Sequence, residues 1–403
     1  MSWTSARALA AGAARPLEPS SVPLSEALGS RLAAPLRALV AVPGVDVSAM
    51  DGYAVTGEGP WRMVGRVLAG GSLYEAELRP GEAVEIATGA PVPAGTEAVL
   101  PWERVTVAPH SRGDAVPRMQ AATPAWGEDV WIEGVAEAGR HIRRRGEDIA
   151  EGAVVLGAGA AVTPVLLGLA AGLGHDELLV RPKPRVAVLV TGDEVVQEGL
   201  PAPGRVRDAI GPFLPGLVEW AGGQVTSTLR LPDGPLPLHD ALAPSAPAPS
   251  DVLVVCGASS KGPADHLRKV LGDLGADVLV DGVAVRPGHP QLLARLPAGR
   301  LLVGLPGNPF AALAAALTLL APMLRELAGT PARHETSALA GPVRAHPRDT
   351  RLVPVRRSSR GAVPVGHDRP GSLWGAALAD ALAVVPPGWS GDQVELIELP
   401  AGV

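Results

Sequence analysis

Several residue types that often carry function are scarce in this chain of 403 residues. It has one cysteine, Cys256, two phenylalanines and two tyrosines. A single cysteine excludes an internal disulfide and a cysteine-based zinc site. No run of about 18 apolar residues is apparent, so no membrane span is expected. Together these absences predict a reduced, cytoplasmic compartment.

An excess of basic charge is also missing, since the formal net charge is −6 at pH 7. The absence of a global basic field argues against binding to nucleic acid or to an acidic membrane surface. Any anion site must therefore be local. Because aromatic residues make up only 3% of the chain, the hydrophobic cores have to be built from Val, Leu and Ala.

The length and the apolar runs predict a multidomain α/β protein. At roughly 100–200 residues per domain, the chain has room for two to four domains. We expect a mixed N-terminal domain of residues 1–43 and 140–180, a β-rich domain of residues 44–139, a central domain of residues 181–327 with a parallel α/β sheet, and a C-terminal β-barrel-like domain of residues 328–403.

In the first two domains the local signals are short. Residues 17–43 are expected to be helical. Val-rich runs broken by Gly and Pro, such as residues 83–86 and 98–100, predict strands. An apolar helix is expected near residues 164–171.

The central domain carries the clearest pattern. Arg185–Val190 is a continuous apolar run, as in a strand that is buried on both faces. Strands and helices then alternate, which predicts a parallel sheet with right-handed crossovers. The expected strands are residues 224–229, 251–255 and 301–304, and the expected helices lie near residues 210–221, 265–274 and Pro309–Leu327.

Three polar loops follow these strands, at the sheet edge where α/β proteins bind ligands. Residues 191–194 (TGDE) contain two adjacent carboxylates, which are suitable ligands for Mg²⁺. The alternative interpretation is a helix N-terminus with a threonine cap. Residues 257–265 (GASSKGPAD) allow backbone N–H groups to approach an anion; the alternative is an ordinary strand–helix loop.

The third loop is LPGNP, residues 305–309. Gly307 is predicted to have positive φ or to let the backbone pass close to a ligand, and Pro309 suits the first helical position. The helix that follows would then point its free N–H donors at the sheet edge. A bare turn is the alternative.

Three more segments lie outside the predicted sheet. Residues 48–55 (SAMDGYAV) and 88–93 (TGAPVP) read first as turn chemistry. The arginine run of residues 143–145 is typical of a solvated face, with a phosphate clamp as the alternative.

Taken together and in order, these segments resemble the molybdopterin molybdenumtransferase family. The order of motifs also separates the chain from single-domain pterin adenylyltransferases, which share only the central unit. The resemblance covers residues 17–403. Its markers are SAMDGYAV, TGAPVP, RRRGEDI (residues 143–149), TGDE and LPGNP, with GASSKGPAD as a weaker one.

The resemblance implies a reaction in which adenylated molybdopterin and molybdate are the substrates, Mg²⁺ is the cofactor, AMP leaves and molybdenum joins the dithiolene. By motif, it implies that the catalytic acids are Asp51, Asp148, Glu194 and Asp265, of which Glu194 and Asp265 bind Mg²⁺. The implied substrate-binding residues are Thr88, Asp233, Ser260, Arg286, His289, Pro306, Pro309, Arg356 and Ser372.

The resemblance also implies a homodimer, in which the β-rich domain of one subunit meets the α/β domain of the other, and it names a pterin adenylyltransferase as a candidate partner. Three segments depart from the family pattern. The usual K-P-G-K-P is RPGHP at residues 286–290, GGxS is GASS at residues 257–260, and D-[ST]-N is DAI at residues 208–210.

These departures leave a second reading open, a divergent paralogue that binds pterin or nucleotide as a carrier or regulator with little turnover. A scaffold protein, as among eukaryotic relatives of this fold, is a third. His289 in place of a lysine predicts that molybdate binding weakens as the pH rises, because a histidine loses its charge near pH 6.5.

Overall fold

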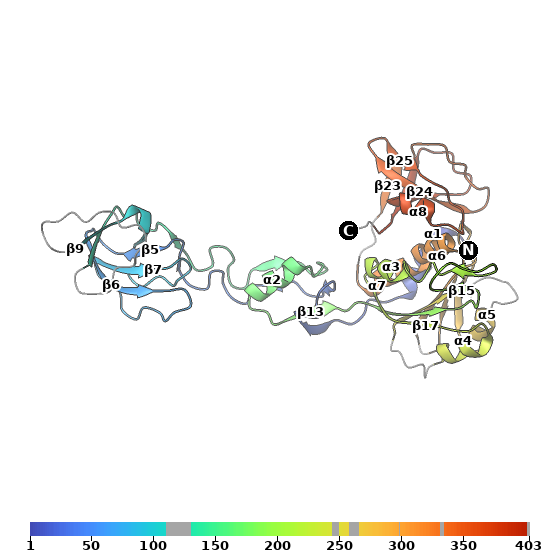
Figure 1. Cartoon of the computed structure of the whole chain (residues 1–403), viewed down its shortest axis with the longest axis horizontal. Helices are drawn as coiled ribbons and strands as arrows, with labels where there is room; N and C mark the ends of the chain where they lie inside the picture. The colour runs from blue at the N-terminus through green and yellow to red at the C-terminus, as the bar shows by residue number, and fades with distance from the viewer. Residues whose placement is uncertain (110–129, 244–249, 258–265, 298, 331–333, 401–403) are drawn as a thin grey trace. The chain divides into compact units, whose positions relative to one another are not determined.

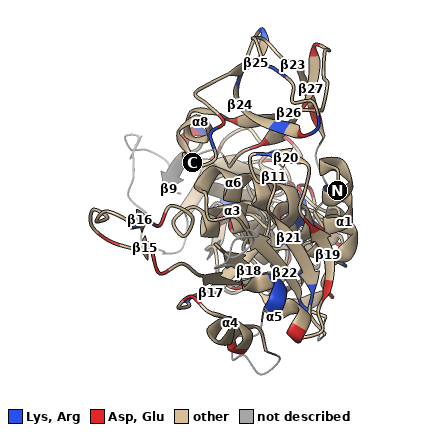
Figure 2. Cartoon of the chain, turned by 90° about the vertical axis from the view of Figure 1, so that its right-hand side faces the viewer, with Lys and Arg blue, Asp and Glu red and all other residues tan. Residues whose placement is uncertain are grey.

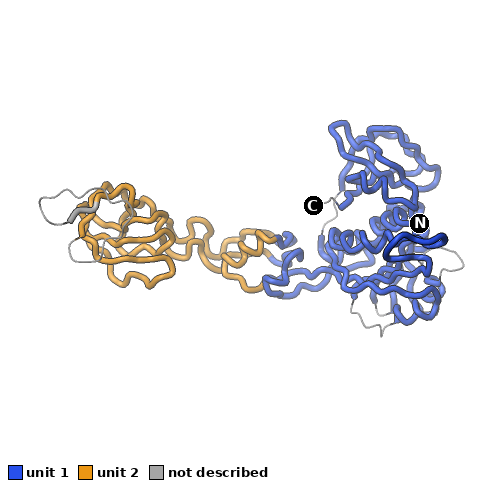
Figure 3. Tube along the Cα trace, viewed as in Figure 1, with its two compact units in different colours: residues 1–34, 158–163, 178–403 blue, residues 35–157, 164–177 orange. Residues whose placement is uncertain are grey.

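The computed structural model describes residues 1–109, 130–243, 250–257, 266–297, 299–330 and 334–400. The chain divides into two compact units (Figure 3). Unit 1 contains Met1–Ala34, Ala158–Thr163 and Leu178–Val403, and unit 2 contains Pro35–Gly157 and Pro164–Glu177. The four predicted domain boundaries remain a prediction.

Unit 2 is built around a six-stranded sheet in the order β8-β5-β7-β6-β10-β9 (Figure 1). Alternate residues of its strands belong to two separate apolar clusters, so both faces of the sheet are covered. The predicted β-rich character is confirmed. The strands are β5 (Gly52–Val55), β6 (Trp61–Val67), β7 (Glu82–Ile86), β8 (Ala98–Pro101), β9 (Thr106–Pro109) and β10 (Val130–Glu133).

Shorter elements complete this part of the chain. The predicted apolar helix is present as α2 (Pro164–Gly172). Two short antiparallel ladders tie distant segments together: β4 (Val47–Ser48) pairs with β11 (Ile142–Arg143), and β3 (Leu36–Arg37) pairs with β12 (Val154–Leu156).

The predicted helix over residues 17–43 is wrong. This segment instead forms β1 (Ser20–Pro23), β2 (Arg31–Leu32) and β3. Five prolines fall within or beside it, and a proline inside a helix removes a hydrogen bond and clashes with the preceding turn. Strands β1 and β2 flank β13 (Glu177–Arg181) in a three-stranded sheet.

The central sheet of unit 1 has the order β17-β14-β18-β22-β21-β19. The four predicted strands are confirmed and run parallel: β14 (Arg185–Val190), β17 (Gln224–Arg230), β18 (Val252–Cys256) and β22 (Leu301–Leu305). The sheet is mixed, because β19 (Asp277–Asp281) and β21 (Leu292–Arg295) add an antiparallel edge.

Helices cover both faces of this sheet. Val186 and Val188 of β14 pack in one cluster with α3 (Leu214–Trp220) and the helix that follows β22. Ala187 and Leu189 pack in another with α4 (Pro235–Leu242) and α5 (Leu267–Asp273). Strand β14 is therefore buried on both faces, as its uninterrupted apolar run predicts.

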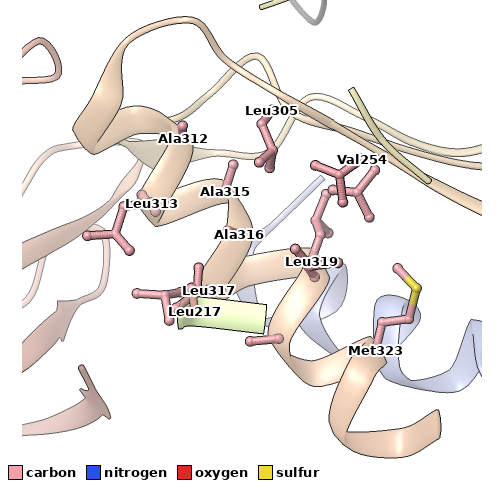
Figure 4. Close-up of a cluster of buried hydrophobic side chains, with 14 of the residues drawn as sticks. Leu217, Val254, Leu305, Ala312, Leu313, Ala315, Ala316, Leu317, Leu319 and Met323 are labelled. Carbon is pink, nitrogen blue, oxygen red and sulfur yellow. The ribbon is translucent and has the colours of Figure 1, made fainter. Parts of the chain in front are cut away.

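The helix after β22 has three parts, α6 (Pro309–Ala315), a π-helical turn (Ala316–Leu320) and α7 (Ala321–Leu327). The wider turn precedes Pro322, which has no N–H to donate to the carbonyl of Thr318. Figure 4 shows its side chains, Leu317 and Leu319 among them, in the core.

This composite helix is the one candidate membrane span among the described residues, by length and composition alone. Pro309–Leu327 is 19 residues long and apolar enough to cross a membrane by length and composition. However, 83% of its apolar window is buried inside the protein. Helix α1 (Trp3–Ala13), which the sequence analysis missed, lies against it, and Trp3 Nε1 donates to Thr318 Oγ1 over 3.2 Å.

The predicted β character after residue 329 is confirmed. A sheet of order β20-β24-β26-β27-β23 contains β20 (Val285–Arg286), β23 (Glu335–Ala338), β24 (Thr350–Ser358), β26 (Ala381–Val385) and β27 (Gln393–Glu398). Strand β25 (Gly361–Pro364) pairs with β24, and helix α8 (Trp374–Leu378) precedes β26. A bridge between Leu339 and Ala362 links β25 to the end of β23. Barrel-like closure remains a prediction.

Candidate functional site

The loops singled out in the sequence lie at one edge of the central sheet. The last residues of three parallel strands are in register, Val190 with Cys256 and Cys256 with Leu305. The Thr191 N–H and hydroxyl both donate to the Cys256 carbonyl, over 3.0 and 2.9 Å. The Gly257 N–H donates to the Leu305 carbonyl over 3.1 Å. The loops after β14, β18 and β22 are therefore neighbours.

The TGDE loop is held from the loop after β17. The two carboxylate oxygens of Asp233 accept the backbone N–H groups of Gly192 and Asp193, over 2.9 and 3.1 Å. Arg230 donates to the carbonyls of Gly192 and Val195. Both carboxylate oxygens of Asp233 are thus engaged in holding the TGDE loop. Asp233 therefore orders this loop in the absence of substrate.

The alternative of a helix after TGDE is wrong. The loop continues into β15 (Val195–Val196), which pairs with β16 (Val206–Arg207). The Glu194 side chain is exposed and forms no hydrogen bond or ion pair within the described ranges. Its carboxylate lies back over Gly192, where a Cβ atom would come within 3.0 Å of it. As far as the described residues show, Glu194 is therefore a free carboxylate on an ordered loop.

The glycine that this edge requires is Gly257, not Gly307. Gly307 does not have positive φ, so the predicted left-handed backbone at this residue is wrong. A Cβ added to Gly307 would lie 3.8 Å from the Gly257 Cα, which is an ordinary contact. Gly257 has φ +96°, and a Cβ there would lie 2.9 Å from the Thr191 carbonyl oxygen. Two predicted site residues, Ser260 and Asp265, lie outside the described residues.

Helix α6 begins at Pro309, as predicted, but its first N–H groups do not point at an open edge. The N–H groups of Phe310 and Ala311 donate to the Pro370 carbonyl, over 2.9 and 3.3 Å. The expectation that these groups point as free donors at the sheet edge is therefore wrong for Phe310 and Ala311. This capping contact brings the loop of Ser372 to the start of α6, beside LPGNP, which contains Pro306.

The RPGHP turn packs against the same end of α6. Gly288 has φ +102°, and a Cβ there would lie 2.9 Å from the Ala311 carbonyl oxygen. Arg286 Nε donates to Asp349 Oδ2 over 2.7 Å, and the guanidinium holds the pKa of that carboxyl below its usual range. The positive charge of Arg286 is thus offset by Asp349, while the exposed His289 ring forms no hydrogen bond within the described segments.

Arg356 is the predicted pocket residue that the structure does not bring into this group. It lies on β24, and its Nε and Nη2 donate to the Leu378 carbonyl over 3.2 and 2.7 Å. Figure 2 shows basic and acidic residues interspersed along the ribbon, in line with an anion site that is local. The structure therefore packs the RPGHP turn on α6, where Gly288 lies next to Ala311, Ala314 and Ala315, and it packs the loop of Pro370 on the first turn of the same helix.

Cys256 lies at the end of β18 in the centre of this edge. Burial, with a smaller contribution from Asp208, raises the pKa of its thiol to about 12. A thiol of that acidity stays protonated at neutral pH and is a poor nucleophile. Asp208 itself accepts the N–H groups of Ile210 and Gly211, each over 2.9 Å, and so orders the turn before α3.

In unit 2, the SAMDGYAV and TGAPVP motifs share one cluster of loops. The Thr88 N–H donates to Asp51 Oδ1 over 2.7 Å, and the Gly89 N–H donates to the Ser48 carbonyl over 2.8 Å. Both Asp51 and Thr88 are exposed. The two motifs are thus brought together as hydrogen-bonded turns, and their role toward substrate stays a prediction.

The RRRGEDI motif adjoins this cluster, because Arg143 of β11 pairs with Val47 of β4. Each of its arginines pairs with an acid: Arg143 with Asp148, Arg144 with Asp46 over 2.6 Å, and Arg145 with Glu151 over 2.5 Å. These pairs are solvent-exposed. The arginine run is therefore an ion-paired surface, and Asp148 is engaged within it.

Metal binding is best judged from the carboxylates that remain free. In the parts of the chain that the structure describes, no three His, Cys, Asp or Glu side chains gather as a metal cage. Mg²⁺ usually keeps several water ligands and binds one or two carboxylates together with substrate phosphate. Glu194 is suited to be one such carboxylate. A separate cavity of about 260 Å³, between the start of α1 and the C-terminal sheet, is lined by none of the predicted site residues.

Three family models match the chain in order. They are the MoeA N-terminal region (domain I and II) over residues 1–174, a probable molybdopterin binding domain over residues 187–326, and the MoeA C-terminal region (domain IV) over residues 336–399.

Curated relatives and solved structures agree with these models. The chain is 36% identical over 332 residues to molybdopterin molybdenumtransferase 2 of Mycobacterium tuberculosis, covering 79% of this chain and 77% of the relative. It is 30% identical over 387 residues to molybdopterin molybdenumtransferase of Bacillus subtilis, covering 92% and 86%. The crystal structure of a molybdopterin biosynthesis moeA protein from Pyrococcus horikoshii matches with a TM-score of 0.76 and 26% identity, covering 100% of both chains.

Proposed function

This chain belongs to the molybdopterin molybdenumtransferase family, and from that premise we propose that it transfers molybdenum from molybdate onto adenylated molybdopterin with Mg²⁺-dependent release of AMP. Membership makes it a transferase that acts in molybdenum cofactor biosynthesis. The specific reaction is supported by one observation: the RPGHP turn and the loop of Pro370 both pack on α6, and the strand before α6 ends in register with the strand that leads into the TGDE loop.

The residues of this edge have distinct roles in the proposal. Arg286 and His289 attract the molybdate dianion, the Ser372 hydroxyl donates a hydrogen bond to it, and Asp349 holds the Arg286 guanidinium in place. Asp233 keeps the TGDE loop ordered, so that Glu194 does not have to be organised when substrate binds.

Glu194 is the residue that would hold Mg²⁺, with Asp265 as the second predicted ligand. When bound, Mg²⁺ supplies positive charge that offsets the charge of the adenylate phosphate. The same proposal includes several points that rest on the family resemblance. These are a homodimer, a pterin adenylyltransferase as partner, a cytoplasmic location, and substrate roles for Asp51, Thr88, Asp148 and Arg356.

The test is AMP release from adenylated molybdopterin by the purified protein, with and without molybdate and with and without Mg²⁺. Release that requires both supports the proposal. Release that is independent of molybdate would contradict it. Sedimentation of the same preparation at micromolar concentration tests the homodimer, and a fully active monomer would contradict that part alone.

A carrier or regulator with little turnover is the second candidate. It is favoured by the replacement of the family's paired lysines by Arg286 and His289, together with the carboxylate of Asp349 that offsets Arg286. The same assay separates the two functions, because a carrier would bind adenylated molybdopterin and molybdate without releasing AMP.

A further inference from the structure

Gln291 is a fully buried polar residue directly after the RPGHP turn. Its exposed fraction is 0%. Its Nε2 donates to the Gly288 carbonyl over 2.8 Å, whereas its Oε1 has no hydrogen-bond partner among the described residues. A buried acceptor without a partner is destabilising, because it has lost its water and gained nothing in return.

The RPGHP turn is fixed from two sides. On one side, Gly288 lies so close to α6 that a Cβ would be 2.9 Å from the Ala311 carbonyl oxygen. On the other side, the Gly288 carbonyl accepts the Gln291 side chain, and the His289 carbonyl accepts the Gln291 backbone N–H over 3.0 Å. Gln291 thus contacts the turn through its backbone and its side chain.

Packing alone does not explain a glutamine at this position. The next two residues, Leu292 and Leu293, are fully buried aliphatic side chains. A methionine has nearly the length of glutamine and would fill the same space without an unpaired oxygen. The contact that methionine could not reproduce is the hydrogen bond from Nε2 to the Gly288 carbonyl.

We infer that Gln291 is a positioning residue of the anion-binding turn, and that its hydrogen bond to Gly288 sets the affinity for molybdate by fixing His289 relative to Arg286. The inference rests on the proposed function, which assigns molybdate to this turn. Arg286 is also held by Asp349 over 2.7 Å. The His289 ring forms no hydrogen bond within the described residues and lies beside Gly282, where an added Cβ would be 3.6 Å from its Nε2, so its position depends on the backbone of the turn.

The test is Gln291→Met. We expect the KM for molybdate in the AMP-release assay, and the dissociation constant for molybdate measured by calorimetry, to rise about three- to tenfold, equivalent to about 0.7–1.4 kcal/mol. The kcat at saturating molybdate should stay unchanged. The midpoint of thermal unfolding should change little, because the removal of the unpaired Oε1 offsets the loss of the hydrogen bond from Nε2 to the Gly288 carbonyl.

Ser250→Ala is the matched control. The Ser250 hydroxyl is also buried and without a partner among the described residues, but it lies before β18, outside the turn. Its removal should leave molybdate affinity unchanged. In a double-mutant cycle, Gln291→Met should add little to His289→Ala and should add fully to Arg286→Ala.

The outcomes separate the inference from the proposed function. If Arg286→Ala raises the KM for molybdate but Gln291→Met does not, the positioning role is overturned while the function stands. If neither variant changes the KM, molybdate does not bind at this turn and the inference is overturned, whereas the proposed function itself is overturned only if AMP release by the wild type does not require molybdate. A large fall in the unfolding midpoint of Gln291→Met would show a structural role and would also overturn the inference.

Discussion

Two acidic side chains beside the arginine run of unit 2 are held differently from two at the sheet edge of unit 1. In unit 2, Asp148 and Asp46 pair with neighbouring arginines on an exposed surface. In unit 1, Asp233 binds two backbone N–H groups instead of a cation, and Glu194 has no partner among the described residues. A paired acid contributes to local order, whereas a free acid on a clamped loop is available to a ligand.

This difference predicts that substitutions in the two units have separable effects. Changes in the loop cluster of unit 2 should alter the free energy of unfolding, and changes at the sheet edge of unit 1 should alter turnover or affinity while stability is retained. The four variants that follow sharpen or break this comparison.

Gly52→Ala should have the largest effect. Gly52 lies in β5, and a Cβ there would be 1.9 Å from the Leu100 carbonyl oxygen in the paired strand β8. Because a backbone atom is in the way, the strands have to separate, and we expect a loss of roughly 3 kcal/mol in the free energy of unfolding of unit 2. This loss is measured by urea denaturation with hydrogen exchange as the readout for unit 2. Gly157→Ala, where nothing lies within 4 Å, is the control, and equal losses in both would contradict the argument.

Glu194→Gln should come next. We expect AMP release to fall at least about tenfold, equivalent to about 1.4 kcal/mol of barrier. The unfolding midpoint should not change, because no contact is lost. Glu198→Gln, which alters another exposed acid of the same segment, should leave AMP release intact. A Mg²⁺ titration identical to that of the wild type would refute a metal-linked role for Glu194.

His289→Lys should alter the pH dependence of molybdate binding. An ordinary histidine titrates near pH 6.5, whereas lysine stays charged at neutral pH. Wild-type affinity should therefore weaken severalfold between pH 6 and pH 8, and the variant should show a flat profile. Calorimetry at pH 6, 7 and 8 gives both profiles; parallel curves would show that the charge of His289 does not control binding.

Asp46→Asn should have the smallest effect. The backbone N–H of Arg145 and the Arg144 side chain lower the pKa of Asp46 in the folded protein. Its contribution to stability is therefore full above the unfolded value near 4 and is lost as the pH falls through the folded value. Since the pair is exposed, we expect the free energy of unfolding of Asp46→Asn to lie less than about 1 kcal/mol below that of the wild type at neutral pH. Urea denaturation between pH 3 and pH 7 should show this difference disappearing at low pH.

Local patterns predicted the elements that are uniformly apolar. The run Arg185–Val190 became β14, and Pro309–Leu327 became a single composite helix. The prediction failed for residues 17–43, where the aliphatic residues favour a helix but four prolines interrupt it. Helix α1 was missed because its Ala-rich sequence has a weak local signal, and its burial comes from contacts with residues about 300 positions away, as between Trp3 and Thr318.

By itself, the sequence determined the family, the order of strands and helices in the central unit, and the placement of its polar loops after strands, because these depend on motifs and on nearby residues. Only the tertiary structure decided what each polar group binds. In that structure, the first N–H groups of α6 donate to the Pro370 carbonyl, and both oxygens of Asp233 accept N–H groups of the TGDE backbone. The Gly288 carbonyl accepts the Gln291 side chain. The first two contacts join segments about 40 to 60 residues apart, and no local pattern encodes such partners. The third spans three residues, but the burial that leaves Gln291 Oε1 unpaired comes from the tertiary structure.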